Sequence, residues 1–329
     1  MTITNKYQIT PISEFLNEPD EPIEWLVDDL LRVGGFSLIS AKPKVGKSTI
    51  ARQLALSVSR GGSFLGRSAI AGKVLYISLE EIRQEIRNHF RILGATGEDN
   101  LEIFVGSLPK DPIEWLGVAI KKHKPNLVII DTLFRITRVV NLNDYAQVTE
   151  ALDPILELAR DNAVHIMGIH HSRKGESSGG DGILGSTAIL GSVDNAIMMD
   201  RDKTSQTIKS IQRYGCDIEE THLIFDESTK SFEMGENKEV KIFESHKSNI
   251  VNFLRSTNKQ VSRDEIESNI KGSTSNKRQS LRELVEEGTV RQSGEGVRGK
   301  PHMYSCFPVS APTQETIKQA MSKSNSLMI

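Results

Sequence analysis

The sequence predicts an α/β fold: a mainly parallel twisted sheet with helices on both faces, followed by a small second domain. Three observations carry this prediction. Apolar segments with strand composition alternate with segments of helical spacing up to residue 171. A basic loop ending in Gly-Lys-Ser joins the first of these strands to the first helix. A charged, apolar-poor stretch over 235–245 then precedes a run of shorter elements.

The alternation can be followed along the chain. Residues 36–40 form an apolar strand, and residues 47–62 follow at helical spacing and end in two glycines. The helix over 145–163 contains Pro154, so we expect an interruption or a kink there. Residues 195–234 contain shorter apolar runs, for which we expect antiparallel strands. The other expected strands are 73–81, 101–106, 126–133 and 164–171, and the other expected helices are 83–95 and 111–125.

Composition divides the chain into five parts. We expect an N-terminal segment over 1–24, a large domain over 25–236, a linker over 237–245, a small domain over 246–309 and a frayed tail over 310–329. The small domain contains three segments with helical pattern and then two strands around a glycine-rich loop. This order of elements is that of a winged helix. The expected helices are 246–257, 262–272 and 274–288, and the expected strands lie within 289–307.

The loop 41–49, AKPKVGKST, has the composition of a phosphate-binding loop. In such a loop, consecutive backbone N–H groups and a helix N-terminus point at one anion. Gly46 lets the backbone pass close to the phosphates, Lys47 supplies positive charge, and the Ser48 hydroxyl can ligate Mg²⁺. Ala41 replaces the glycine of the general pattern, which is harmless if its φ is negative. We expect ATP to contact Ala41, Lys42, Pro43, Lys44, Val45, Gly46, Lys47, Ser48 and Thr49.

This loop resembles that of the DnaB-type replicative helicases, which also begin with alanine and carry proline in the middle. The longer stretch EWLVDDLLRVGGFSLISAKPKVGKS is similar to the plasmid RepA-like branch of RecA-like ATPases. The resemblance extends from about Trp25 to Gly215, with several motifs in the expected order. It implies a RecA-like P-loop NTPase domain that hydrolyses ATP.

The resemblance also implies roles for two acidic residues. Asp131 ends an apolar strand, where its carboxylate can hold Mg²⁺ opposite Ser48; the alternative is a helix-capping aspartate. Glu80 matches the glutamate that polarises the attacking water, and Glu81 follows it directly. Because successive side chains of a strand point to opposite faces, only one of these two glutamates can lie in the site, and we favour Glu80.

Two further residues complete the catalytic set that the resemblance implies. His170 stands where a polar residue senses the γ-phosphate, and His171 follows it. Adjacent histidines on a strand point in opposite directions, so we do not expect them to share a metal. RepA-like proteins carry an arginine before a Gly-Ser pair, but this chain has Leu184 there. The late-strand pattern of DnaB-like proteins retains Arg213, our candidate for the arginine that completes a neighbouring subunit's site; an ordinary surface arginine is the alternative.

Two regions are candidates for contact with DNA. The loop 172–187 is rich in glycine and serine, and the resemblance places such a loop at the channel of a ring, where Arg173 and Lys174 would touch single-stranded DNA. A flexible surface loop is the alternative. Arg135 and Arg138 form a second, weaker candidate. In the small domain, the helix 274–288 and the following loop would meet duplex DNA through Asn276, Lys277, Arg278, Gln279, Arg298 and Lys300.

Charge distribution supports a nucleic-acid partner for the small domain. The whole chain has a formal net charge of −2, whereas residues 241–309 contain 12 Lys and Arg against 8 Asp and Glu. A winged helix that contacts proteins is the alternative. Two widely separated cysteines, the absence of a signal-like start and the lack of a long apolar run favour a cytoplasmic protein without membrane contact.

We therefore expect an ATP- and Mg²⁺-dependent DNA-binding ATPase that forms a homo-oligomer, a hexameric RepA-like helicase of plasmid or mobile-element replication. A DNA-binding regulator switched by ATP, without translocation, is the alternative. A small-molecule kinase would share the phosphate loop, but the sequence has no evident arginine-rich lid.

Overall fold

The computed structural model describes residues 9–139, 141, 144–171, 187–203, 205–297 and 300–306. The chain divides into two compact units, Met1–Gly235 and Glu236–Ile329. Within the described residues, no helix is both long enough and apolar enough to span a membrane.

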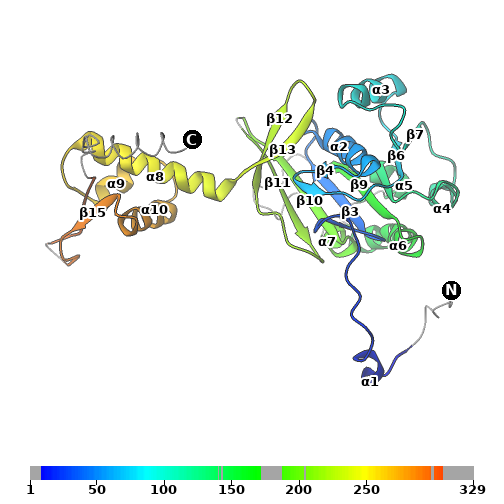
Figure 1. The fold of residues 1–329 in the computed structure, drawn as a ribbon, viewed down its shortest axis with the longest axis horizontal. Coiled ribbons are helices and arrows are strands. Elements are labelled where there is room, and N and C mark those ends of the chain that lie inside the picture. Colours follow the sequence, from blue (N-terminus) through cyan, green and yellow to red (C-terminus); the bar gives the residue numbers. More distant parts are fainter. Residues whose placement is uncertain are drawn as a thin grey trace, which may run out of the picture. The chain divides into compact units, whose positions relative to one another are not determined.

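A nine-stranded sheet forms the centre of the first unit (Figure 1), in the order β13-β12-β11-β10-β3-β9-β8-β6-β7. The six strands from β10 to β7 are parallel to their neighbours, and β11 runs antiparallel to β10, as β12 does to β11. The result is a mixed, mostly parallel sheet. The strands are β3 (Phe36–Ala41), β6 (Val74–Ser78), β7 (Leu101–Val105), β8 (Leu127–Asp131), β9 (His165–His171), β10 (Asn195–Arg201), β11 (Gln206–Gln212), β12 (Thr221–Asp226) and β13 (Ser231–Asn237).

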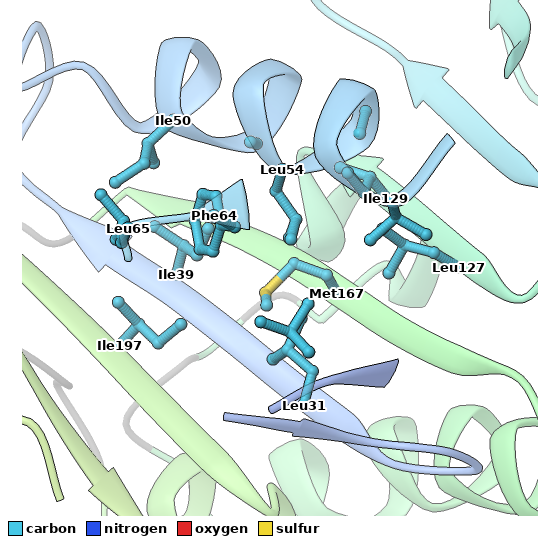
Figure 2. Close-up of a cluster of buried hydrophobic side chains, with 14 of the residues drawn as sticks. Leu31, Ile39, Ile50, Leu54, Phe64, Leu65, Leu127, Ile129, Met167 and Ile197 are labelled. Carbon is cyan, nitrogen blue, oxygen red and sulfur yellow. The ribbon is translucent and has the colours of Figure 1, made fainter. Parts of the chain in front are cut away.

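Helices cover both faces of this sheet, and two apolar clusters mark the two sides. One cluster joins α2 (Lys47–Arg60) and α3 (Arg83–Ile92) to the sheet; in Figure 2, Leu54 of α2 lies over Ile39, Ile129 and Met167 of three strands. The other joins α4 (Pro112–His123), α5 (Leu133–Thr137), α6 (Tyr145–Asp161) and α7 (Thr187–Ser192) to the opposite face. Burial on both faces explains why these strands read as continuous apolar runs.

Smaller elements complete the first unit. The helix α1 (Ile12–Phe15) lies in an exposed N-terminal segment. Strands β1 (Trp25–Val27) and β2 (Leu31–Arg32) pair antiparallel, and so do β4 (Ser63–Phe64) and β5 (Arg67–Ser68).

The strands expected within 195–234 pair antiparallel as predicted, β10 with β11 and β11 with β12. The sequence did not predict that β10 also pairs in parallel with β3. Helix α6 runs through Pro154 without the expected interruption. Proline cannot make one of the backbone hydrogen bonds of the helix, and the burial of four side chains offsets this loss. The four completely buried residues are Val148, Leu152, Ile155 and Ala159.

The second unit is built from three helices and a three-stranded antiparallel sheet of order β14-β16-β15. Its own apolar core includes Ile250, Leu281 and Tyr304. Residues 238–245, expected as part of an irregular linker, form the first turns of α8, where the Asn237 side chain accepts hydrogen bonds from the N–H groups of Glu239 and Val240. The elements are α8 (Lys238–Thr257), β14 (Val261–Ser262), α9 (Arg263–Asn269), α10 (Thr274–Glu286), β15 (Val290–Ser293) and β16 (Met303–Cys306).

Candidate functional site

The carboxyl edge of the parallel strands gathers the residues that the sequence singles out. In the register of the sheet, Ser40 of β3 lies beside His170 of β9, and Asp131 of β8 lies beside Ser78 of β6. The loop after β3 and the glutamates after β6 therefore emerge at the same edge. Ligands of open α/β sheets bind at this edge.

The loop between β3 and α2 has the backbone of an anion site. Gly46 adopts a left-handed conformation, with φ of 97°, directly before the first residue of α2. Ala41 is the last residue of β3, an extended conformation that alanine adopts without strain. The N-terminus of a 14-residue helix thus points out of the loop, where its free N–H groups and dipole favour an anion.

Strands from the antiparallel side of the sheet brace this loop. Gln206 of β11 donates a hydrogen bond to the Val45 carbonyl, and Gln53 of α2 exchanges two with the backbone of Phe232 in β13, at 2.8 and 2.9 Å. A Cβ at position 46 would lie only 2.8 Å from Cζ of Phe232. Glycine is therefore required at position 46 both by its φ and by the neighbouring ring.

Lys47 lies beneath the loop with its side chain 3% exposed. Its Nζ donates to the carbonyl oxygens of Ala41 at 2.8 Å and of Lys42 at 2.9 Å. Burial lowers the pKa of Lys47 to about 8, and the negative charges of Asp131 and Glu80 oppose this shift. An ammonium group held this way is ready to pair with a phosphate.

Ser48 and Asp131 form an oxygen pair suited to Mg²⁺. The Ser48 hydroxyl and the Asp131 carboxylate are hydrogen-bonded, and burial raises the pKa of Asp131 against the effect of that bond. The hydroxyl of Tyr76 donates to Asp131 at 3.1 Å. No group of three or more His, Cys, Asp or Glu among the described residues could hold a metal by itself. One hydroxyl and one carboxylate fit Mg²⁺, which takes its other ligands from nucleotide phosphates and water.

The two glutamates after β6 have different neighbours. Glu81 pairs with Arg52 of α2, which is almost completely buried, and with His89 of α3 at 3.3 Å. The charge of Glu80 acts on the pKa of Lys47, whereas both glutamates border a cavity of about 500 Å³. The electrostatic link to Lys47 favours Glu80 over Glu81, and its catalytic role stays a prediction.

Three residues for which we expected no such role hold the carboxylate of Glu80. Arg135 Nε donates to its carboxylate at 3.0 Å, Thr132 Oγ1 at 3.2 Å, and His171 Nε2 lies 3.4 Å away. Burial alone would raise the pKa of Glu80, but the hydrogen bond from Arg135 and the charge of His171 outweigh burial and lower it. The signal was the position of Arg135, four residues after Asp131 at the same sheet edge.

His170 and His171 point to opposite faces of the sheet, as the strand period requires. His170 is buried and packs edge-on against Phe134, with ring centroids 4.9 Å apart, on the side of α5. His171 approaches Glu80. His171 is thus the histidine in contact with Glu80, and the expected role of His170 in sensing the γ-phosphate stays a prediction.

Arg213 follows β11, at the amino-terminal edge of the parallel strands. Its backbone N–H donates to the carbonyl of Asp194, just before β10, and its Nη2 donates to Gly191 at 2.9 Å. Lys47 of the same chain lies at the opposite edge. The exposed Arg213 side chain thus cannot complete the site of its own chain.

The expected DNA contacts of the second unit fall into two groups. Arg278 and Gln279 of α10 are exposed and Asn276 is half-buried, although Arg278 pairs with Glu267 at 2.7 Å. Lys300 is exposed and pairs with Glu295. Lys277 is a correction: it is 6% exposed, and its Nζ donates to the carbonyls of Glu267 and Ile270, so it stabilises the end of α9 and cannot reach DNA. The other candidates lie outside the described residues: Arg173, Lys174, Leu184 and Arg298.

Sequence reasoning did not foresee that Arg263 and Arg282 line a basic groove in the second unit. A cavity of about 380 Å³ between α10, the start of α9 and the β15–β16 pair is lined by Arg263, Arg282 and His302. Both arginines are exposed, and neither forms an ion pair within the described part of the chain. The available signal was the spacing of Arg278 and Arg282, one helical turn apart.

The sheet order, the phosphate loop at the carboxyl edge and the buried Asp131 define a P-loop ATPase with a RecA-like ATPase domain, a class that uses ATP with Mg²⁺. The chain belongs to the AAA domain family, whose sequence profile matches residues 5–177, more than half of its length. It is also similar to the DNA repair protein RadA of Aquifex aeolicus (strain VF5), with 29% identity over 134 residues. That alignment covers 40% of this chain and only 27% of RadA.

Proposed function

We propose that this protein is an ATP-hydrolysing DNA-binding protein, a RepA-like hexameric helicase or ATPase in the replication of a plasmid or mobile element. Single-stranded DNA would pass through the ring of ATPase domains, and duplex DNA would bind the second unit. The observation that carries the enzymatic part is the convergence of Lys47, Glu80 and Asp131 at one sheet edge, beside the N-terminus of α2.

Each residue has a distinct task in this proposal. Lys47 neutralises the β- and γ-phosphates, and Ser48 with Asp131 would hold Mg²⁺. Glu80 accepts a hydrogen bond from the attacking water once its carboxylate is free of Arg135. The exposed Arg213, at the far edge of the sheet, would enter the site of a neighbouring subunit, which makes hydrolysis depend on assembly.

The second unit supports the DNA-binding part. Three helices followed by a pair of antiparallel strands, with a third short strand between the first two helices, have the order of a winged helix. The exposed face of α10 carries Arg278, Gln279 and Arg282, which suits a recognition helix. Arg263 and His302 add positive charge to the adjoining groove. The similarity to a protein named for DNA repair agrees with a DNA partner.

One observation favours the second candidate, a DNA-binding regulator that ATP switches without translocation. The carboxylate of Glu80 is already engaged by Arg135, Thr132 and His171, so the resting site is not poised to polarise a water. Slow turnover would follow, and ATP could then act as a long-lived ligand that sets DNA affinity.

The deciding experiment measures ATP hydrolysis with no DNA, with single-stranded DNA and with duplex DNA, at several protein concentrations. We expect single strands to stimulate turnover, and the rate per subunit to rise with concentration. Lys47→Ala should abolish turnover. A mixture of the Arg213→Ala and Lys47→Ala proteins should recover part of the turnover. In a mixed assembly, some sites combine the intact Lys47 of one subunit with the intact Arg213 of its neighbour. Negligible turnover together with ATP-dependent duplex binding would overturn the motor and leave the regulator.

A further inference from the structure

The turn 213–217, directly after β11, begins with Arg213, and every residue in it is exposed. Exposed turns are ordinarily among the more mobile parts of a protein. An arginine that has to meet a phosphate in another subunit needs a fixed direction instead, because a misplacement of about 1 Å can cost about a hundredfold in rate. The contacts that hold this turn therefore bear on hydrolysis.

The bend of the β1–β2 hairpin holds the turn through Asp29. The N–H of Cys216 donates a hydrogen bond to Oδ1 of Asp29 at 3.0 Å. The side chain of Gln212 donates to the carbonyl oxygen of Asp29 at 3.3 Å. One of these donors precedes Arg213 in the chain and the other follows it. Asp29 thus grips the turn on both sides of the arginine.

Gly215 lets the turn approach the hairpin closely. Its φ of 84° is left-handed, and a Cβ at this position would lie 2.6 Å from Oδ1 of Asp29 and 3.0 Å from Cη2 of Trp25. Beside it, the guanidinium of Arg32 lies over the ring of Tyr214, 5.0 Å from the ring centroid. Three residues of the hairpin therefore contact the turn.

The hairpin is a firm support for these contacts. Arg67 of β5 donates to the carbonyl oxygens of Asp28 and Asp29, each at 3.1 Å, and to Oδ2 of Asp29 at 3.2 Å. One carboxylate oxygen of Asp29 thus holds the turn, while the other is held by Arg67. The apolar side chains of the hairpin are at most 2% exposed and belong to the core of the first unit: Leu26, Val27, Leu30 and Leu31.

We propose that Asp29 is a positioning residue for Arg213: it joins the 213–217 turn to the buried β1–β2 hairpin and so fixes the direction in which Arg213 leaves the sheet. This inference rests on the proposed role of Arg213 in the site of a neighbouring subunit. Loss of the Asp29 side chain should therefore damage the sites of neighbouring subunits and leave the phosphate loop of its own chain intact.

Three variants of the full chain isolate this contact. Asp29→Gly removes the side chain and tolerates the left-handed backbone at this position, where φ is 48°. Asp29→Asn keeps an oxygen that can accept from Cys216 and removes only the charge. Asp28→Gly is the matched control, because it makes the same change at the adjacent, exposed residue. Binding of a fluorescent ATP analogue checks that each variant is folded around its phosphate loop.

The assay is ATP turnover with single-stranded DNA. We expect Asp29→Gly to lose about tenfold to a hundredfold, while Asp29→Asn and Asp28→Gly stay close to the unchanged chain. A mixture of Asp29→Gly with Lys47→Ala should recover part of the turnover, because some sites combine an intact Lys47 with a well-placed Arg213. A mixture of Asp29→Gly with Arg213→Ala should not recover, because both proteins lack the same contribution. A merely structural role of Asp29 would not separate these two mixtures.

The outcomes distinguish this inference from the function on which it rests. Unchanged turnover in Asp29→Gly, together with a defect in Arg213→Ala, would overturn the positioning role and leave Arg213 in place. Recovery with Arg213→Ala, or no recovery with Lys47→Ala, would also overturn it, because Asp29 would then act through another part of the chain. Normal turnover in Arg213→Ala, or none in the unchanged chain, would overturn both the role of Arg213 and its positioning.

Discussion

Lys47 should take up a proton when nucleotide binds, and the amount should grow with pH. Its Nζ is buried beneath the phosphate loop against two carbonyl oxygens, and burial lowers its pKa to about 8. A neutral amine cannot pair with a phosphate as an ammonium does. A triphosphate beside Nζ raises the pKa of Lys47, so binding restores the missing proton.

The size of the effect follows from the pKa of the free protein. With a pKa of about 8, the neutral form of Lys47 makes up about a quarter of molecules at pH 7.5 and about nine tenths at pH 9. Proton uptake per nucleotide should therefore rise from about 0.2 to about 0.9 across this interval. The affinity for nucleotide should be highest below pH 8 and should fall above it. Well above pH 8, the loss should approach about tenfold for each pH unit.

The assay is calorimetry with a non-hydrolysable ATP analogue and Mg²⁺, performed at each pH in two buffers with different heats of ionisation. Lys42→Gln is the matched control: Lys42 lies in the same loop, but its side chain is 41% exposed and pairs with Asp200. It should keep the pH-dependent uptake. Uptake that stays constant between pH 7.5 and pH 9, or that Lys42→Gln removes, would refute the assignment to Lys47.

Three further predictions concern the loop, the core and the second unit. Gly46→Ala should weaken nucleotide binding about tenfold or more in a fluorescence titration, and adding Phe232→Ala should recover only part of it, because the clash disappears but the positive φ remains. Leu54→Ala should lower the free energy of unfolding by about 2–5 kcal/mol in urea, whereas Val118→Ala, at 59% exposure, should change it by less than about 0.5 kcal/mol. Lys277→Ala should destabilise the second unit by about 1–3 kcal/mol, since two carbonyls lose their donor, and should leave the affinity for duplex DNA unchanged. Arg282→Ala should leave stability unchanged and weaken duplex binding. Thermal unfolding and a salt-dependent duplex titration measure the two effects.

The sequence predicts the strands and helices around the phosphate loop well, because their signals are local. The apolar run of β3, the spacing within α2 and the glycine after Arg60 all lie within a few residues of each other. The direction of β10, by contrast, has no local signal in the sequence. Its parallel partner β3 lies about 160 residues earlier, and nothing within 195–201 records that pairing. Helix α8 begins earlier than expected because its first turns are charged and carry little apolar periodicity.

The candidate site divides in the same way. Residue type and position at strand ends are enough to propose Lys47, Ser48, Asp131 and Glu80. Partners contributed by other elements are not visible in the sequence. Glu81 forms an ion pair with Arg52 of α2, and the buried Lys277 donates hydrogen bonds to carbonyl groups at the end of α9. Both follow from packing between segments, which motif spacing does not encode.

Turnover of Glu80→Gln beside Glu81→Gln tests the central claim most directly. Both substitutions remove one negative charge and keep the size of the side chain, and they are adjacent in the chain. We expect Glu80→Gln to bind ATP normally but to lose at least about a hundredfold in single-turnover hydrolysis, because the group that polarises the water is gone. Glu81→Gln breaks the ion pair with Arg52, so its main effect should be a lower free energy of unfolding, with a smaller effect on the rate of hydrolysis. Hydrolysis that survives Glu80→Gln and disappears in Glu81→Gln would contradict the account.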